Sequence, residues 1–248
     1  MDKEDLRKKA LEETRENLKQ ADRDQFIVKA VKYLEEVERG YSNEVERFRD
    51  WYAIHFPELE EEIQDDDEFV KLLKRGIHRD ELDPFQEMAE KSTGSPLEGK
   101  DREMLETAFE RIESSHEIRE EIREYVKDSA LEVMPNLSKL LDPILAAKVI
   151  AIEGSLEGLA KEPASTIQML GAEKALFRYL RGEGTPPKHG VIFEHPFVSD
   201  LPEDKRGKMA RFIGNKAAIA ARLDVYGDKD KGKSLRDEAQ EKYQSLKE

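Results

Sequence analysis

Apolar residues in the first half of the chain follow a repeating pattern of steps of four and three positions. Starting at Ile27, the steps are four, three, seven, four, three and four, which is the heptad seam of a long helix. A second run, from residue 105 to residue 133, keeps this alternation but contains polar residues. The pattern predicts two long helices. The seam of the first consists of Ile27, Val31, Leu34, Tyr41, Val45, Phe48 and Tyr52.

Turn-forming residues separate the two runs. Pro57 breaks the first helix, and residues 92–99 are rich in glycine, serine and proline. We therefore expect residues 1–134 to form a long antiparallel coiled-coil hairpin with an elaborated tip from residue 58 to about residue 91. Because a heptad seam is a narrow apolar stripe, we also expect a partner to bury more of the hairpin.

After Pro135 the pattern changes to short helical segments punctuated by glycine and proline. Residues 191–193 are compatible with a short extended piece. The predicted fold is all-α, with residues 135–248 forming a compact helical domain that ends in a C-terminal helix. Helical spacing occurs over residues 144–152, 164–170, 173–181, 205–223 and 235–246.

Composition restricts the cellular setting. Charged residues make up 40% of the 248 residues and apolar residues 38%, which favours an elongated helical body over one large core. The chain has no cysteine, so it has no disulfides or thiolate metal ligands, and a reducing compartment suits it. It contains neither a signal-peptide pattern nor an 18-residue apolar run. We expect a soluble, cytoplasmic protein without a membrane partner.

The net charge of −14 is unevenly distributed along the chain. Residues 1–134 hold 23 basic and 39 acidic residues, hence −16, whereas residues 135–248 hold 19 and 17, hence +2. Residues 163–222 hold 10 and 6, hence +4. A phosphate backbone senses charges within a Debye length, about 8 Å at physiological salt, so the local excess decides whether RNA is attracted.

Two cations, Lys174 and Arg178, stand four residues apart on the predicted helix that follows Gly171. Leu176 and Phe177 lie between them, so cations and apolar groups project in different directions and suit a joint surface with RNA and protein. The free amides at the start of this helix would attract a phosphate. In the alternative interpretation Leu176 or Phe177 belongs to the core and the cations are only solvated.

A second basic row lies on the helix predicted over residues 205–223. Its members are Lys205, Lys208, Arg211, Lys216 and Arg222. Three of them, Lys208, Arg211 and Arg222, share one side by the helical period, beside an alanine-rich packing face. If about five cations contact phosphates, the slope of log affinity against log salt is about −3.5 to −4.5. A solvated basic face is the alternative.

Signatures of enzymes are missing from the sequence. We find no convincing nucleophile and base, no catalytic residues, no phosphate-cradling glycine loop, and no cofactor or metal motif. His189, Glu194 and His195 lie near one another in sequence, but no periodic helix fixes their spacing, so structural or RNA-contacting roles are favoured over metal binding. An enzyme whose site is assembled from scattered residues remains the alternative.

Six blocks within about ninety residues resemble the Nop domain, the RNA- and protein-binding module of the archaeal Nop protein and its nucleolar and spliceosomal relatives. The blocks cover residues 134–137, 154–160, 163–168, 170–178, 188–190 and 217–224. Residues 51–59 also resemble the family's pattern at the end of its first coiled-coil helix.

The resemblance implies an RNA-binding scaffold of a box C/D-type ribonucleoprotein, which docks on a kink-turn RNA already bound by a small ribosomal-protein-like partner. Such a scaffold helps to direct 2′-O-methylation of rRNA or tRNA by a separate methyltransferase. In the family, two copies associate through the coiled coil, which implies a homodimer that uses the seam residues. The matching RNA- and protein-binding residues are Gly171, Ala172, Glu173, Lys174, Ala175, Leu176, Phe177, Arg178, Lys188, His189, Gly190, Lys208, Arg211 and Arg222.

Three questions remain open from the sequence. Relatives carry a fibrillarin-binding region ahead of the coiled coil, whereas residues 1–25 are too short and too charged to form one, so fibrillarin binding is undecided. The chain could instead be a coiled-coil adaptor that keeps the fold without binding RNA. It could also be an RNA-binding subunit of a complex unrelated to methylation.

Overall fold

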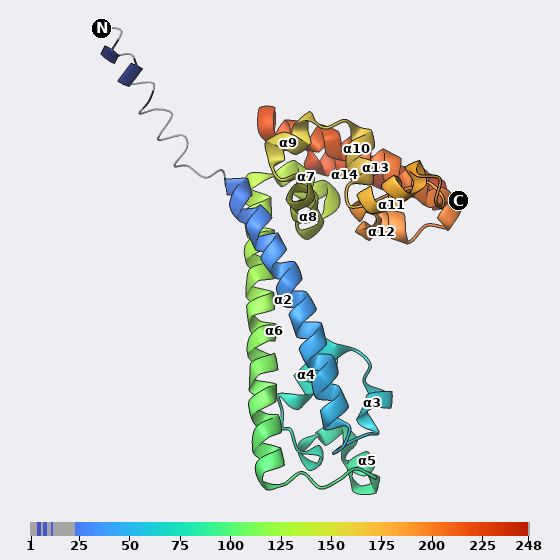
Figure 1. The fold of residues 1–248 in the computed structure, drawn as a ribbon. Helices are drawn as coiled ribbons and strands as arrows, with labels where there is room; N and C mark the ends of the chain where they lie inside the picture. Colours follow the sequence, from blue (N-terminus) through green and yellow to red (C-terminus); the bar gives the residue numbers. More distant parts are fainter. Residues whose placement is uncertain (1–3, 6, 9–10, 12–22, 248) are drawn as a thin grey trace. The chain divides into compact units, whose positions relative to one another are not determined.

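The computed structural model describes residues 4–5, 7–8, 11 and 23–247, and within these residues every regular element is a helix (Figure 1). The predicted all-α fold is therefore confirmed. The expectation for residues 1–25 lies mostly outside the described residues. Contacts divide the chain into two compact units, residues 33–122 in one and residues of 1–32 and 123–248 in the other. We call them the hairpin unit and the C-terminal unit; the domain boundary after residue 134 stays a prediction.

Two long helices form the frame of the hairpin unit, as the sequence predicts. They are α2 (Arg23–Tyr52, 30 residues) and α6 (Gly99–Val133, 35 residues), each of which continues into the C-terminal unit. Within the hairpin unit they lie side by side with opposite chain directions (Figure 1). The rings of Phe48 and Phe109, one from each helix, are 5.8 Å apart in the shared core. Coiled-coil geometry stays a prediction.

The seam of α2 is buried inside the chain. Its residues Ile27, Val31, Leu34, Tyr41, Val45, Phe48 and Tyr52 are each between 0% and 3% exposed. We expected these side chains to contact a second copy, and this assignment is wrong for the structure, because they already pack against residues of their own chain. Any second copy must contact other positions.

The tip of the hairpin unit folds back on the two long helices. It contains α3 (Leu59–Glu62), α4 (Asp66–Leu73), η1 (Arg79–Glu81), η2 (Asp83–Phe85) and α5 (Gln86–Lys91). Phe69 and Leu73 of α4 enter the core. The Arg79 guanidinium donates to the carbonyl oxygens of His55 and Gly94, both at 2.9 Å, and so ties the two connecting segments together.

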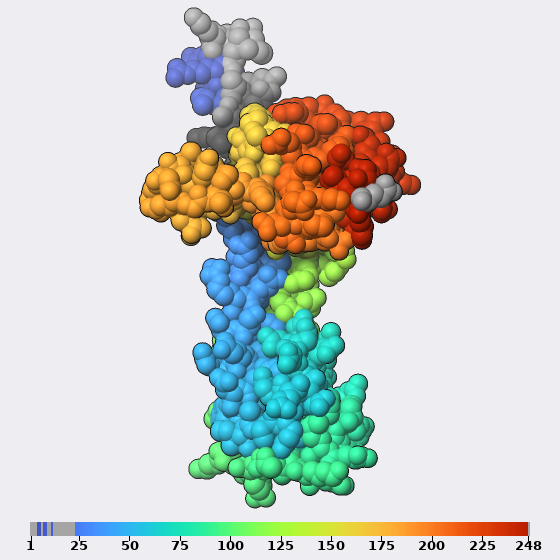
Figure 2. Space-filling view, turned by 90° about the vertical axis from the view of Figure 1, so that its right-hand side faces the viewer, coloured from blue at the N-terminus to red at the C-terminus, as the bar shows by residue number. Residues whose placement is uncertain are grey.

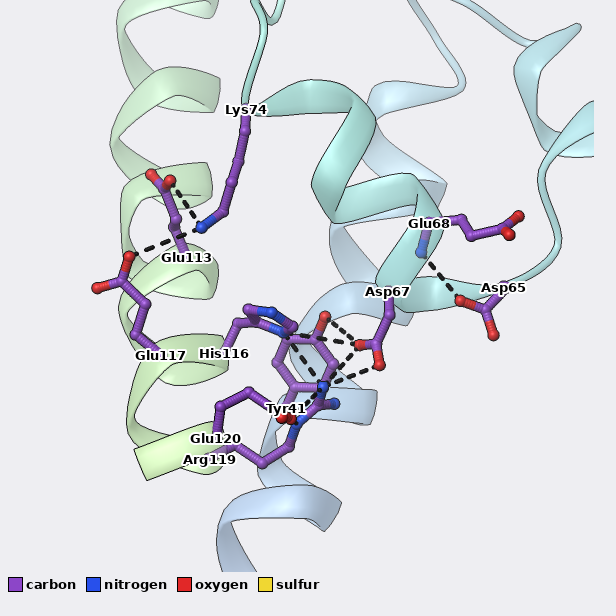
Figure 3. A network of polar contacts seen from close by, with 10 residues as sticks. All are labelled: Tyr41, Asp65, Asp67, Glu68, Lys74, Glu113, His116, Glu117, Arg119 and Glu120. Atoms are coloured by element: carbon purple, nitrogen blue, oxygen red, sulfur yellow. Dashed lines mark hydrogen bonds and ion pairs between the residues drawn. The ribbon is translucent and has the colours of Figure 1, made fainter. Parts of the chain in front are cut away.

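A polar network explains why polar residues interrupt the seam of α6 (Figure 3). Arg119 donates to Asp67 of α4 at 2.9 Å and lies 4.3 Å from the ring centre of Tyr41, whose hydroxyl also donates to Asp67. Burial would raise the pKa of Asp67, but the hydrogen bonds from Arg119 and Tyr41 outweigh burial and lower it. The network thus joins α2, α4 and α6 at one level.

Short helices packed around one long helix make up the rest of the C-terminal unit. The long helix is α13 (Glu203–Tyr226), which packs against α7, α9, α10, α12 and α14. The surrounding helices are α7 (Pro135–Leu141), α8 (Pro143–Glu153), α9 (Leu156–Lys161), α10 (Ala164–Met169), α11 (Glu173–Leu180), α12 (Pro196–Ser199) and α14 (Gly232–Lys247). All five helical segments predicted from the sequence are present, with shifted ends.

Residues 191–193 are not extended, which corrects the prediction for this segment. They belong to the 3-10 helix η3 (Val191–Glu194). The amide of Val191 donates to the carbonyl of Leu170 at 2.7 Å, and the chain then turns so that Ile192 is fully buried. Anchoring at one end and burial of one side chain favour a tight turn over a strand that would have no partner strand.

A buried clasp connects the start of α7 to the end of α13. The Asp224 carboxylate accepts hydrogen bonds from the amides of Asn136 and Leu137, both at 2.9 Å. The side chain of Asn136 in turn accepts from the amides of Lys231 and Gly232 at the start of α14. Free amides at a helix N-terminus prefer a negative partner, so this arrangement orients three helices at once.

Among the described residues, no helix is both long enough and apolar enough to cross a membrane.

Candidate RNA- and protein-binding surface

Helix α11 stands out from the C-terminal unit as a lobe, gold to orange in Figure 2. It starts after Gly171, whose φ of 83° lies in the left-handed region that glycine adopts readily. The carboxylate of Glu173 accepts a hydrogen bond from the Gly171 amide at 2.7 Å and closes this turn. No residue of α11 is buried. The helix is therefore held at its base and presents its side chains to solvent.

Apolar and cationic side chains are both available on α11. Phe177 is 58% exposed and Leu180 is 68% exposed, whereas Leu176 is half-buried. The interpretation in which Leu176 or Phe177 belongs to the core is thus not what the structure shows. Lys174 and Arg178 are exposed, and neither side chain makes a hydrogen bond or ion pair with the residues that the structure describes. Both sets of groups can therefore contact a partner.

The segment of Lys188, His189 and Gly190, which we call the 188–190 loop, packs against the end of α10. A Cβ added to Gly190 would lie 1.8 Å from the carbonyl oxygen of Leu170, so no side chain fits at this position. The Gly190 amide donates to the carbonyl of Gln168 at 3.0 Å, and the Gln168 side chain donates to the carbonyl of Lys188 at 2.7 Å. The loop conformation is thus fixed by its own backbone.

The basic row on α13 is only partly free. Lys205 donates to the carbonyl of Leu246 and Lys216 pairs with Glu238, both on α14. Arg222 donates to the carbonyls of Ala160 and Glu162 at 3.0 and 3.1 Å, so it caps the end of α9. These three cations support the packing of α13.

The remaining cations of the row, Lys208 and Arg211, are exposed and have no hydrogen-bonding or ionic partner among the described residues. Their position connects them to the 188–190 loop. Gly207, next to Lys208, lies against the side chain of Lys188, and Gly214 lies against Gln168 of α10. Arg211 stands one helical turn from each of these glycines. By the helical rise, Arg222 lies about 16 Å farther along the axis.

Two residues that the sequence analysis missed hold His189. Its imidazole stacks on the Phe193 ring with centroids 4.7 Å apart and an interplanar angle of 16°. The guanidinium of Arg206 lies 5.3 Å from the centre of the same Phe193 ring. Burial lowers the pKa of His189, and the positive charges of Arg206 and Lys188 lower it further. The only sequence signals for this contact were the basic residues at the start of the helix predicted over residues 205–223 and the aromatic residue Phe193.

The other histidine of this region has a structural position. His195 is buried, its Nδ1 accepts from the Phe197 amide at 3.1 Å, and its Nε2 lies 3.1 Å from the carbonyl oxygen of Leu140. Glu194 pairs with Lys148 at 2.7 Å. Within the described part of the chain, no group of three or more His, Asp or Glu residues is arranged to hold a metal ion.

The structure thus brings the start of α11, the 188–190 loop and the first turns of α13 together and places Arg222 apart. The described residues form a pair of long helices and a compact helical unit that bears unpaired cations beside exposed apolar groups, an arrangement that suits contact with another macromolecule. The family model described as "Nop: snoRNA binding domain, fibrillarin" matches residues 33–245. The chain belongs to the Nop family, as the resemblance in its sequence indicated.

Individual relatives are consistent with this family. The chain is 36% identical over 220 residues to an uncharacterized NOP5 family protein of Methanocaldococcus jannaschii, covering 83% of this chain and 53% of that protein. It is 32% identical over 240 residues to human nucleolar protein 56, covering 88% and 40%. The chain therefore spans about half, or less, of these relatives.

A solved structure, that of a fibrillarin/Nop5p complex, contains a chain of similar fold. The TM-score is 0.60 at 28% sequence identity, and the match covers 98% of this chain and 78% of that one.

Proposed function

We propose that this protein is a non-enzymatic RNA-binding scaffold of a box C/D-type ribonucleoprotein, which docks on a kink-turn RNA already bound by its small ribosomal-protein-like binder. The observation that carries the proposal is the projecting helix α11, which offers unpaired cations and exposed apolar side chains on one short element. Cations suit RNA phosphates, and exposed apolar side chains suit a protein surface. A composite of RNA and protein meets both requirements.

Docking on a composite does not need high affinity for either component. The apolar side chains of α11 bury their area on the small protein while Arg178, Lys208 and Arg211 contact phosphates. Because the two sets of contacts form together, the second is made at the high effective concentration that the first creates. We therefore expect weak binding to the RNA alone and tight binding to the protein–RNA complex.

The structure changes the expected salt dependence of α13. Of its five cations, Lys205, Lys216 and Arg222 have partners within the chain. If only Lys208 and Arg211 contact phosphates, α13 contributes a slope of about −1.4 to −1.8 in a plot of log affinity against log salt. A larger total slope requires contacts by Lys174, Arg178 and Lys188.

The hairpin unit suits a role away from RNA. Residues 33–122 hold 12 basic and 28 acidic residues, hence a net charge of −16. Such a charge repels a phosphate backbone at close range. We therefore assign RNA binding to the C-terminal unit alone.

We propose that the hairpin unit mediates homodimerisation through a second row of residues, which keeps the same steps of four and three and runs one position before the seam positions. We call this row the outer stripe. On α2 it contains Tyr33, Val37, Gly40, Glu44, Arg47 and Trp51, and on α6 it contains Met104, Ala108, Arg111, Ser115 and Ile118. A groove of about 410 Å³ lies along it, lined by Trp51 and Ala108 among others.

Exposure and charge favour a second copy as the occupant of the outer stripe. Tyr33 is 57% exposed, Met104 55% and Ile118 45%, which are large apolar side chains that an association can bury. Glu44 and Arg111 pair across the stripe at 2.7 Å, so both signs of charge are present on one face. A twofold dimer presents the same face twice and therefore needs such self-complementarity.

Sedimentation at tens of micromolar tests the dimer. Trp51→Glu combined with Ile118→Glu should give a monomer, whereas Ile54→Glu is the matched control, since Ile54 is 62% exposed and lies outside the stripe. A wild-type protein that sediments as a monomer would refute the dimer. A dimer that resists the double substitution would refute the outer stripe.

We further propose that this protein helps to direct 2′-O-methylation of rRNA or tRNA by a separate methyltransferase. We also propose that it resides in the cytoplasm. Fibrillarin is the partner named for the solved relative. Pull-down of fibrillarin with this chain tests whether the described residues suffice. Failure to retain it, with RNA binding intact, would favour an RNA-binding subunit of a complex unrelated to methylation.

A gel shift on a kink-turn RNA, with and without its small protein binder, tests the central proposal. We expect a supershift only when the small protein is present. Arg178→Glu with Arg211→Glu should abolish it, whereas Lys233→Glu, an exposed cation on α14, should not. A supershift that survives the double reversal would favour a protein-interaction adaptor. No supershift with the wild-type protein would refute the proposed function.

A further inference from the structure

A groove of about 780 Å³ opens at the tip of the hairpin unit, and we call it the tip groove. Its apolar part consists of Pro84, Phe85 and Met88. Phe85 and Met88 are half-buried, because they also pack against the core of the hairpin unit. The tip groove therefore has an apolar floor that belongs to the fold. Its polar and charged lining residues are Glu58, Glu62, Asp83, Gln86, Glu87 and Lys91.

The charge of the tip groove is strongly one-sided. Four carboxylates and one lysine line it, hence a formal charge of −3. The groove is built within residues 58–91, which hold 5 basic and 13 acidic residues, hence −8. Charges of one sign along a concave protein wall reinforce one another and focus the field in the groove. The tip groove therefore attracts cations and repels a phosphate backbone.

The carboxylates of the tip groove differ from others in the hairpin unit in lacking a cation of their own chain. Asp67, for comparison, pairs with Arg119 at 2.9 Å. In the groove, Glu62, Asp83 and Glu87 have no cationic partner among the described residues, and Asp83 accepts only from a glutamine side-chain amide at 3.3 Å. These three carboxylates are thus available to cations of another molecule.

Hydrogen bonds hold one wall of the tip groove in place. The Glu58 carboxylate accepts from the Ser92 hydroxyl at 2.7 Å and from the amide and hydroxyl of Thr93 at 2.8 and 3.0 Å. Burial would raise the pKa of Glu58, but these hydrogen bonds outweigh burial and lower the pKa to about 2. A fixed carboxylate beside a fixed apolar floor is a preorganised surface, which reduces the entropy lost on binding.

The combination of carboxylates with an aromatic floor indicates the class of occupant. Among the described residues, no group of three or more His, Asp or Glu residues is arranged to hold a metal ion. A guanidinium can bind a carboxylate through two parallel hydrogen bonds and can also lie on an aromatic face such as Phe85. The methylene stem of arginine packs on apolar side chains such as Met88. An arginine side chain therefore uses every part of the groove, whereas a polyamine uses only its charge.

We infer that the tip groove is a docking site for an arginine-rich segment of a partner protein. The site uses different residues from the outer stripe and from the surface of the C-terminal unit, and it goes beyond the proposed function without depending on it. Because its ion pairs are exposed, each contributes modestly and binding weakens as salt rises. Planar guanidinium contacts should favour arginine over lysine.

Fluorescence anisotropy with the full chain tests this inference. The probes are two labelled peptides of equal length, in which either arginine or lysine alternates with alanine. We expect saturable binding that is tighter for the arginine peptide. Glu62→Lys with Glu87→Lys should weaken this binding by about tenfold or more, since both side chains are exposed and two attractions become repulsions.

The matched control is Glu35→Lys with Glu121→Lys. Both carboxylates are exposed on the long helices of the hairpin unit and lie outside the tip groove, and the change in net charge is the same. Binding of the arginine peptide should stay close to that of the wild type. Equal losses in the two double variants would show a general attraction to an acidic protein and would overturn the inference.

Phe85→Leu separates the aromatic contact from the charge. It keeps an apolar side chain but removes the π-face, so the arginine peptide should bind about 2- to 5-fold more weakly and the lysine peptide should lose less. Circular dichroism should show wild-type helical content for each variant. Equal affinity of the wild type for both peptides, or no binding at low salt, would overturn the inference. Neither result bears on the proposed function, since the assay contains no RNA.

Discussion

The clasp at Asp224 makes a quantitative prediction about stability. Asp224 is 4% exposed, and its carboxylate accepts hydrogen bonds from the amides of Asn136 and Leu137 at the start of α7. Asp224→Ala leaves both amides buried without an acceptor. Each lost hydrogen bond to a charged group lowers the free energy of unfolding by about 1.5 to 3 kcal/mol. Burial raises the pKa of Asp224, which reflects the unfavourable desolvation of its carboxylate and reduces the expected sum. We expect a net loss of about 3 kcal/mol.

Thermal unfolding followed by circular dichroism measures this loss. For a unit of this size, about 3 kcal/mol corresponds to a decrease in Tm of about 10 °C. Asp224→Asn should fall between the wild type and Asp224→Ala, since its amide oxygen still accepts one of the two hydrogen bonds. Asp237→Ala is the matched control, because Asp237 is exposed on α14. If Asp224→Ala melts within about 2 °C of that control, the clasp does not hold α7 as described.

Three further predictions concern other sites. Phe177→Ala with Leu180→Ala should change the free energy of unfolding by less than about 0.5 kcal/mol, since both side chains are exposed, yet weaken docking on the protein–RNA complex by about 2 to 4 kcal/mol in a titration. Gly190→Ala should lower Tm and should weaken RNA binding at least severalfold, because its Cβ would overlap the Leu170 carbonyl. Wild-type values of both Tm and RNA affinity would contradict this geometry. Asp67→Asn should destabilise the hairpin unit by about 1 to 3 kcal/mol at pH 7 in urea titrations. The pKa of Asp67 is lower in the folded state, so its contribution is present above its ordinary pKa of 3.8 and disappears as the pH falls through the lower folded value. A destabilisation by Asp67→Asn that does not shrink as the pH is lowered below 3.8 would refute the assignment.

The heptad spacing predicted the two long helices because burial along one face of a helix leaves a direct record in the sequence. The same sequence pattern does not show which residues or which partner molecule buries that face. The seam of α2, from Ile27 to Tyr52, is covered by the chain's own residues, and the sequence pattern is the same for an internal and an external partner. The presence of Arg119 in the α6 seam is explained by its hydrogen bond to Asp67, which lies 52 positions away in the sequence.

For the candidate site, the helical period groups Lys208, Arg211 and Arg222 on one side of α13, and this grouping stays a prediction. It did not show that Arg222 is used to cap α9, because that depends on where α9 packs. Phe193 was missed for a related reason: its stacking on His189 is a tertiary contact with no periodicity in sequence. Local patterns thus located the elements, whereas tertiary packing decided which side chains remain available.

The absence of space for a side chain at Gly190 has a consequence for binding affinity. A flexible loop must lose conformational freedom whenever a ligand arrives, and that loss subtracts from affinity. The 188–190 loop has already lost this freedom during folding, since three hydrogen bonds to Gln168 and Leu170 hold it in place. A partner that docks on this loop would therefore meet a preorganised surface, and its affinity would not be reduced by the ordering of the loop.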